Sequence, residues 1–335
     1  MLKVTGCVRQ RGRSSLRSVA FWAALALLFS SAGFAQDYPV RPIRVIVASG
    51  AGGGTDLTAR HVVKTLTELS RYPAFVENKP GAGSTTGTDF VAKAASDGYT
   101  LLFSSGSSIV MNGFLYRNLP YDSLRDFVPV GFAAAYPFML ITRLDLPPNT
   151  LAEFVKYARE RPGKLTYASP GVGSVQHVWG TILFKSMGLN MLHVPYKAAA
   201  AAHPDLIAGR IDAMFDNLSA SRKYVQAGRL KALAVSAPNR ASQLPNVPTI
   251  NETGVVNFDG ESWMGMFAPA DTPPAIVDAL RAALNGVNRD PDFAARIEDS
   301  GGRVLAIAAQ QQQQFLRHEI ERWGTLIRQY GVSAE

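Results

Sequence analysis

Ser49-Gly-Ala-Gly-Gly-Gly-Thr-Asp56 is the first of two turns that set the architecture of this chain. It follows the apolar run 43–48 and precedes a helical pattern that begins at Leu57. The second turn, Ser169-Pro-Gly-Val-Gly-Ser174, stands in the same way between the apolar run 165–168 and a helical pattern that continues through Met187. Each turn therefore predicts a unit in which a strand leads through a flexible polar turn into a helix.

Such a unit is suited to binding an anion. The N–H groups in the first turn of a helix have no partner within the helix, and the helix dipole adds positive potential at the same end. Glycines let the backbone approach a ligand closely. One unit in each half of the chain predicts two halves that close on one acidic small molecule.

Residues 1–35 are typical of an export signal. Five basic residues precede the 11-residue apolar run 19–29, and small residues at Gly33 and Ala35 suit a cleavage site after Ala35. The run is shorter than the roughly 20 apolar residues that span a bilayer, so an uncleaved anchor is the weaker interpretation. We expect a soluble mature protein in the periplasm.

Charge and cysteine content exclude several classes of function. Removal of residues 1–35 takes away five basic and no acidic residues, which lowers the formal net charge from +8 to +3. No basic stripe remains, and we expect no nucleic-acid partner. The single cysteine, Cys7, lies within the predicted signal, so thiol catalysis and cysteine metal sites are excluded from the mature chain.

Apolar β-rich runs alternate with helical patterns along the mature chain. The runs are expected at 43–48, 99–103, 138–142, 165–168, 211–215, 231–235 and 263–267. One helix, 151–161, begins with a capping box in which Thr150 caps and Glu153 reaches back. This alternation predicts an α/β fold with parallel sheets, in which ligands bind beyond the carboxyl ends of the strands.

The first turn matches no nucleotide-binding motif. A G-x-G-x-x-G spacing from Gly50 would need glycine at position 55, which is threonine, and no Gly-Lys-Ser/Thr follows. Thr55 can add a hydroxyl to the binding surface. We expect Asp56 to cap the helix, because an ionised carboxylate facing an anion would repel it. An ordinary tight turn is the alternative interpretation.

Ser174 and His177 leave a second function open. Ser174 is a good helix N-cap, and His177 follows one turn later, so the pair also allows a serine nucleophile with its base. No G-x-S-x-G elbow surrounds Ser174, and no carboxylate is placed to orient His177. We therefore favour a cap and a pocket or structural histidine over a secreted hydrolase.

Other polar turns extend the predicted site, while metal chemistry has little support. The turns 78–84 and 104–108 place Ser84, Ser107 and Ser108 beside strand ends, although solvent-exposed loops are nearly as good an interpretation. The histidines have no metal-ligand spacing. Asp205, Asp212 and Asp216 are expected to be separated by a helix-to-strand transition. We expect no metal and no cofactor.

A series of motifs follows in order from residue 38 to the C-terminus, and together they are highly specific. They are Tyr38-Pro-Val-Arg-Pro-Ile43, Gly52-Gly-Gly-Thr-Asp56, Val76-Glu-Asn-Lys-Pro-Gly-Ala-Gly83, Asp97-Gly-Tyr-Thr-Leu-Leu102, Gly171-Val-Gly-Ser-Val-Gln-His177, His193-Val-Pro-Tyr-Lys197, Asp205-Leu206 with Gly209, and Leu244-Pro-Asn-Val-Pro-Thr249. On these motifs the mature chain resembles the periplasmic substrate-binding receptors of tripartite tricarboxylate transporters, the Bug family.

The resemblance implies a type II periplasmic binding protein, with two α/β domains, a hinge and an interdomain ligand cleft. Domain 1 would comprise residues 36–140 plus 262–335, and domain 2 residues 141–261. The protein would bind a di- or tricarboxylate, an acidic amino acid or an aromatic acid, and deliver it to the large and small permease subunits. It would be a monomer and not an enzyme; a sensory accessory protein that docks on a membrane sensor is the other role considered.

The resemblance also implies the contacts to the ligand. Backbone amides and ordered waters would hold the carboxylate, with one loop contributed by each domain, and Asp205 matches a family carboxylate that helps hold these waters. Ala48-Ser49-Gly50 and 198–204 depart from the family pattern. The expected ligand-binding residues are Gly52, Gly53, Gly54, Thr55, Ser84, Ser107, Ser108, Ser169, Gly171, Gly173, Ser174, His177 and Asp205.

Overall fold

The computed structural model describes residues 1–2, 38–258 and 260–333. The predicted signal lies almost entirely outside the described residues. Contacts divide the chain into the units Met1–Val40 and Arg41–Glu335, and the described helices and strands all belong to the second. Within the described part of the chain, no helix combines the length and apolar character needed to cross a membrane.

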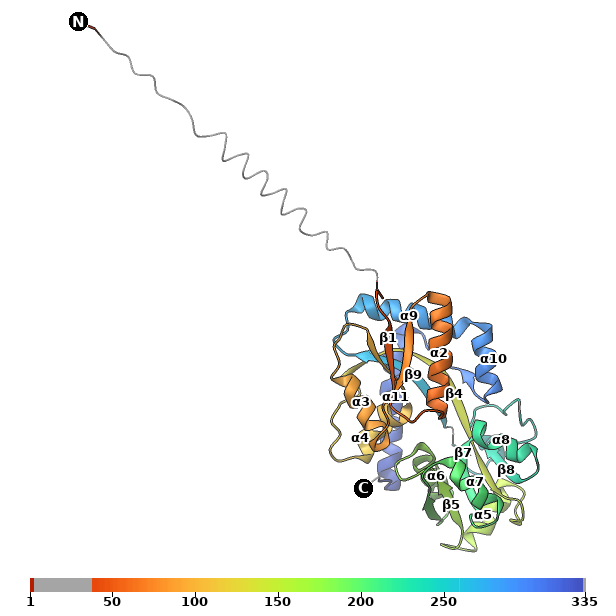
Figure 1. Cartoon of the computed structure of the whole chain (residues 1–335). Coiled ribbons are helices and arrows are strands. Elements are labelled where there is room, and N and C mark those ends of the chain that lie inside the picture. The colour runs from red at the N-terminus through yellow and green to blue at the C-terminus, as the bar shows by residue number, and fades with distance from the viewer. Residues whose placement is uncertain (3–37, 259, 334–335) are drawn as a thin grey trace. The chain divides into compact units, whose positions relative to one another are not determined.

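The strands of this unit form one ten-stranded sheet (Figure 1). Eight of them follow the order β2-β1-β3-β9-β4-β7-β5-β6, while β8 and β10 pair with β4 off this path. The strands are β1 (Ile43–Val47), β2 (Ala74–Asn78), β3 (Thr100–Ser105), β4 (Phe127–Arg143), β5 (Thr166–Ser169), β6 (Leu192–Pro195), β7 (Ala213–Asn217), β8 (Leu230–Val235), β9 (Glu261–Pro269) and β10 (Arg303–Val304).

The sheet is mixed, which corrects the expectation of purely parallel sheets. β1 pairs in parallel with β2 and β3, and β5 with β6 and β7, but β4 and β9 run antiparallel to their neighbours. The alternating pattern predicts parallel strands joined by helices. It finds only 138–142 of β4, because this strand is 17 residues long and buried along nearly all of its length, so it has no period-2 alternation.

β4 joins two groups of elements. Its residues up to Pro137 pair with β9, and those from Phe138 pair with β7 and β8. We call β1–β3, β9, β10, α2–α4 and α9–α11 the first lobe, and β5–β8 with α5–α8 the second lobe; β4 runs through both (Figure 1). Buried apolar side chains form the core, and one cluster of them, around Met139, Leu206 and Met214, packs β4 against the second lobe.

The predicted helices are present, and their first and last residues lie close to those expected from the sequence. The capping box at Thr150 is confirmed, because Glu153 N donates to Thr150 Oγ1, although the Glu153 carboxylate reaches back to Asn149 N rather than to Thr150. The helices are α2 (Gly54–Ser70), α3 (Thr85–Ala92), α4 (Asn112–Leu115), α5 (Leu151–Arg159), α6 (Val175–Ser186), α7 (Ala199–Ile207), α8 (Leu218–Gln226), α9 (Pro274–Arg289), α10 (Pro291–Asp299) and α11 (Ala309–Tyr330), with short helical turns at Ala82–Ser84, Ser107–Met111 and Asn251–Thr253.

The two strands at the ends of the sheet order, β2 and β6, were not predicted from the sequence, and the reason is physical. β2 and β6 each lie at an end of the sheet order, and neither contains a fully buried residue. An edge strand with mixed polar and apolar residues lacks the continuous apolar run that marks an interior strand. Both strands nevertheless extend the sheet that carries the glycine turns.

Candidate functional site

A cleft of about 540 Å³ lies at the carboxyl ends of the strands, where helices from both lobes begin. The N-terminal residues of α2, α6, α7 and α8 contribute to its walls, together with the segments that follow β1, β3 and β7. The lining residues are Ser49, Gly54, Thr55, Gly83, Ser84, Ser105, Ser107, Phe138, Pro170, Val172, Gly173, Ser174, Val175, Gln176, Ala199, Asp216, Asn217, Ser219, Ala220, Ser262 and Met264.

The structure brings members of both predicted turns to this cleft, while other predicted residues do not line it. Gly52, Gly53, Ser108, Ser169, Gly171 and His177 are not lining residues, and Asp205 is on the flank of α7. The predicted residues that line it are Gly54, Thr55, Ser84, Ser107, Gly173 and Ser174.

The first glycine turn leaves the start of α2 without a side-chain cap. Its N-cap is Gly53, and no side chain accepts a hydrogen bond there. The expectation that Asp56 caps the helix is wrong in detail, because Asp56 lies within the first helical turn and its Oδ2 accepts from Gly52 N at 2.8 Å. The carboxylate thus braces the turn from behind, and the first N–H groups of α2 stay directed at the cleft.

Asp56 is a buried charge with several partners. Its carboxylate also accepts from Arg60 Nε at 3.0 Å and from Asn78 Nδ2 at 3.0 Å. Burial alone would raise the pKa of Asp56, but these hydrogen bonds, led by that of Arg60, outweigh it and lower the pKa. Asp56 is therefore held ionised as a structural anchor of the turn.

The second turn is braced in the same manner. Ser174 is the N-cap of α6, as expected, and its Oγ accepts from His177 N at 3.2 Å. Gly173 N donates to His177 Nδ1 at 3.2 Å. Gly171 has φ +130°, a conformation that other residues rarely adopt, and its carbonyl accepts from Ser174 Oγ at 2.7 Å.

A pair of histidines supports this turn from the interior. The rings of His177 and His193 stack with centroids 4.2 Å apart, and His193 Nε2 lies 2.7 Å from the buried Ser169 Oγ. Burial, with smaller contributions from His193 and Lys185, lowers the pKa of His177 to about 4. Burial also lowers the pKa of His193. Both rings are therefore neutral at neutral pH.

The serine-rich turns contribute unequally. Ser107 lines the cleft, and its Oγ lies 2.8 Å from Ser105 Oγ. Ser84 also lines it and has φ +73°, an uncommon value for a serine. Ser108, in contrast, is fully buried and shares a hydrogen bond of 2.5 Å with Ser104.

Asp205 lies outside the cleft-lining set. Its carboxylate accepts from Tyr196 Oη at 2.7 Å and from Arg210 Nη1 at 2.6 Å, and these two hydrogen bonds lower its pKa. Burial and the bond to Asp205 raise the pKa of Tyr196 to about 12. A role of Asp205 in holding waters at the ligand stays a prediction.

Sequence reasoning missed the contribution of α7 and α8. Asn217 ends β7 and caps α8 by accepting from Ser219 N at 3.0 Å, so this segment is a third strand–turn–helix unit. Asn-Leu-Ser-Ala after the apolar run 211–215 was the available signal, but it contains no glycine. At α7, the N-cap Ala198 offers no side-chain cap, and Ala199 reaches the cleft.

Ser174 and His177 are not arranged as a nucleophile and base. Ser174 Oγ donates to the Gly171 carbonyl, and His177 Nδ1 is occupied by Gly173 N–H. A general base needs a free ring nitrogen within hydrogen-bond reach of the nucleophile. Nor do the described residues contain a group of three metal-ligating side chains.

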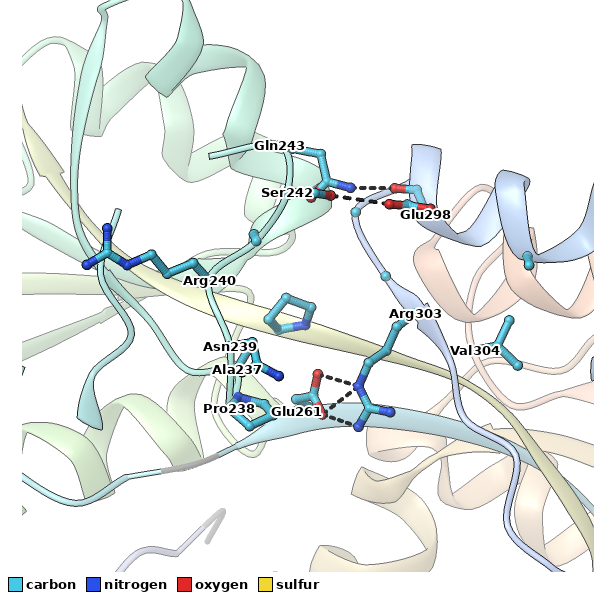
Figure 2. A pocket seen from close by; sticks show the side chains of 15 residues that line it. Ala237, Pro238, Asn239, Arg240, Ser242, Gln243, Glu261, Glu298, Arg303 and Val304 are labelled. Carbon is cyan, nitrogen blue, oxygen red and sulfur yellow. Dashed lines mark hydrogen bonds and ion pairs between the residues drawn. The ribbon is translucent and has the colours of Figure 1, made fainter. Parts of the chain in front are cut away.

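A second hollow, of about 680 Å³, is lined in part by residues of β9 and β10 and contains none of the predicted site residues (Figure 2). Its charged groups have partners within the protein. Arg303 pairs with Glu261, and Glu298 accepts from Ser242 Oγ and, through its carbonyl, from Gln243 Nε2 (Figure 2). Arg240 pairs with Glu252, which is not part of the hollow. The cleft at the helix N-termini is the better candidate, because helices from both lobes begin there and the first N–H groups of a helix have no partner within it.

Two lobes that share one sheet, with a cleft at the carboxyl ends of the strands, define a periplasmic binding protein of the two-domain α/β type. Residues 58–332 match the family described as "Tripartite tricarboxylate transporter family receptor". The chain belongs to this family, whose members are periplasmic solute-binding receptors and not a class of enzyme.

The relatives agree over nearly the whole chain. The "UPF0065 protein in tcbD-tcbE intergenic region" of Pseudomonas sp. (strain P51) is 37% identical over 321 residues, which are 95% of each chain. The structure of the periplasmic binding protein BugD is 34% identical with a TM-score of 0.77, and the match covers 88% of this chain and 99% of that one. The R. palustris protein Rpa4515 with adipate is 31% identical with a TM-score of 0.80, covering 88% and 99%.

Proposed function

We propose that this protein captures a small organic carboxylate in the cleft and delivers it to the permease subunits of a tripartite tricarboxylate transporter. The observation that carries the proposal is the convergence of the N-termini of α2, α6, α7 and α8 on one cavity. Four helix ends aimed at one point favour an anion there. The adipate bound to the similar protein Rpa4515 supports a carboxylate as that anion.

The expected donors are backbone amides and hydroxyls. Among the described residues that line the cleft there is no lysine or arginine, so a carboxylate must be held by N–H and O–H groups. Thr55 and Ser174 place hydroxyls beside the helix ends, one from each lobe. Because α2 and α7 lack side-chain caps, a ligand oxygen takes the place of a cap at each.

Closure would bring the two lobes onto the ligand. We place the hinge where β4 changes partners, between Pro137 and Phe138, and where the neighbouring Glu261 begins β9. These crossings lie close to the domain limits 140 and 261 proposed from the sequence. Contacts to both lobes exist only in the closed form, so a bound ligand favours it.

The cellular location follows from the proposed signal. Cleavage after Ala35 would release residues 36–335 into the periplasm, where the family acts. Delivery to the large and small permease subunits would then take place at the outer face of the inner membrane.

The test measures ligand binding and closure on purified residues 36–335. A broad carboxylate panel is screened by thermal shift, and native mass spectrometry looks for a co-purified acid. Closure is followed by tryptophan fluorescence, because Trp179 of α6 stacks on Trp323 of α11 with centroids 4.6 Å apart across the two lobes. At least one acid should raise the melting temperature and alter the fluorescence; a panel without any such acid would refute the proposal.

A further inference from the structure

The floor of the cleft in the second lobe is a buried carboxylate. Asp216, near the end of β7, has no solvent exposure as a residue but lines the cleft. It lies between α7 and α8, which both pack on β7. From α7 and α8 the cleft is lined by Ala199, Ser219 and Ala220, which all have small side chains. Asp216 therefore contributes to the cleft wall where no bulky side chain of these helices does.

Only one oxygen of Asp216 is satisfied within the protein. Oδ2 lies 2.7 Å from His203 Nε2 and also accepts from Ser221 Oγ. His203 and Ser221 are themselves buried. Oδ1 is buried as well, yet it has no hydrogen-bond partner among the described residues. Buried carboxylate oxygens are normally paired, so an oxygen without a partner beside a ligand cleft calls for a donor from the cleft side.

We propose that Asp216 Oδ1 accepts a hydrogen bond from a hydroxyl or amino group on the bound acid. This inference rests on the proposed function and narrows its ligand class. The ligand carboxylate would lie at the N-termini of α2 and α6, and the donor group of the ligand would face Asp216. His203 and Ser221 hold Oδ2 from behind, which fixes the carboxylate so that Oδ1 is presented to the ligand.

The charge in the cleft also favours an acid with a hydroxyl or amino group over an acid with a second carboxylate near Asp216. Asp216 carries the only ionisable side chain among the described lining residues. A second ligand carboxylate beside it would meet a like charge, whereas an alcohol or an ammonium group would meet an acceptor. An unsubstituted alkyl chain would leave Oδ1 without a hydrogen-bond donor in the complex. A buried acceptor without a donor weakens ligand binding.

The test uses matched sets of acids that differ only in the donor group. The sets are propionate, lactate and alanine; succinate, malate and aspartate; and benzoate, 4-hydroxybenzoate and 4-aminobenzoate. Dissociation constants are measured by calorimetry on residues 36–335. In the set that fits the cleft, the hydroxy or amino acid should bind roughly ten- to hundredfold more tightly than the unsubstituted acid. In the first two sets the substituted members distinguish a hydroxyl from an ammonium group, and in the aromatic set they distinguish a hydroxyl from a neutral amine.

Two variants test the assignment to Asp216. Asp216→Asn removes the charge and should reduce the preference to near unity. Since this change also disturbs the contact with His203, Ala220→Val provides a second test. It adds bulk to a residue of α8 that lines the cleft with Asp216, leaves Asp216 itself unchanged, and should reduce the preference as well. Asp278→Asn, an exposed carboxylate on α9, should leave the preference unchanged.

The outcomes separate the two proposals. If acids bind but the unsubstituted acid has the same dissociation constant as the hydroxy and amino acids of its set, the role of Asp216 is refuted and the receptor function stands. A preference that persists in both Asp216→Asn and Ala220→Val also refutes it. If no acid of any set or of the broad panel binds, the proposed function fails and this inference fails with it.

Discussion

The backbone N–H of Gly173 donates a hydrogen bond to Nδ1 of His177, four residues further along the chain, at 3.2 Å. The first turn repeats the relationship, since Gly52 N donates to Asp56 Oδ2, again four residues on. In both cases the acceptor belongs to the third residue of the helix and braces the glycine just before the N-cap. The two turns, one in each lobe, therefore share a local support.

The burial of His177 predicts acid sensitivity. Its folded pKa of about 4 lies below the unfolded value near 6.5, so the unfolded chain takes up the proton first as pH falls. The free energy of unfolding should drop between pH 6.5 and 4, by about 2 kcal/mol from this group once its residual solvent access is allowed for. Urea titrations at several pH values measure it.

A variant isolates that contribution. His177→Asn retains an acceptor for Gly173 N–H but does not titrate, so its stability should fall less steeply over the same pH range. The exposed His318 provides the control, and His318→Asn should follow the parent protein. Parallel curves for His177→Asn and the parent would rule out this role of His177.

Removal of the Asp56 carboxylate should destabilise the fold. Asp56→Ala removes a buried carboxylate that accepts from Gly52 N–H, from Arg60 and from the Asn78 amide, which keeps its bond to the Ser49 carbonyl; this loss costs about 2–4 kcal/mol. Asp56→Asn keeps an acceptor and should lose less. Chemical denaturation gives the comparison, with Asp278→Ala as an exposed-pair control expected to change stability by under about 0.5 kcal/mol. Equal effects of Asp56→Ala and Asp278→Ala would contradict the buried anchor.

Substitution of Gly54 should weaken ligand binding with little change in stability. A Cβ at Gly54 would lie 3.7 Å from Met264 Cε, an ordinary contact, so Gly54→Ala should fold with a stability change under about 1 kcal/mol. The added methyl group stands at the start of α2 within the cleft and should weaken carboxylate binding by about tenfold. Gly286→Ala, on α9 with open space around it, is the matched control with unchanged affinity. Unchanged affinity in Gly54→Ala would place the carboxylate elsewhere.

The two N-caps can be compared directly. Ser174→Ala and Thr150→Ala each remove a side-chain cap, and each should cost about 1 kcal/mol of stability. Ser174 alone of the two lines the cleft, so only Ser174→Ala should also weaken binding of the acid. Melting temperature and calorimetry give the two readouts. Loss of affinity in both variants would mean that the effect is one of general stability.

Sequence patterns predicted well what depends on neighbouring residues. The Ser174 and Thr150 caps are confirmed, because a cap is a contact between residues three apart in the chain. Asp56 was assigned the wrong role, because it accepts from Gly52 N and does not cap the helix. Its further bonds to Arg60 and Asn78 include a partner 22 residues away that no local pattern could reveal.

The long-range features of the site were beyond such patterns. The pairing of β4 with β9, β7 and β8 determines where the lobes join, and it depends on segments more than 70 residues apart. The same pairing places β7 beside β4 and so brings Asp216 and the start of α8 to the cleft. His203 lies in the segment 198–204, which departs from the family pattern, and its role is apparent only from its contact with Asp216.

By itself the sequence determined the strand–turn–helix units, the glycine conformations and the family, because hydrogen bonds within a turn and motifs along the chain are local properties. The tertiary structure alone decided which helix ends share one cavity and which predicted residues do not line it. It also decided that a carboxylate oxygen lies beneath that cavity without a partner. These features depend on packing between distant segments, where burial and pairing are set by the whole sheet.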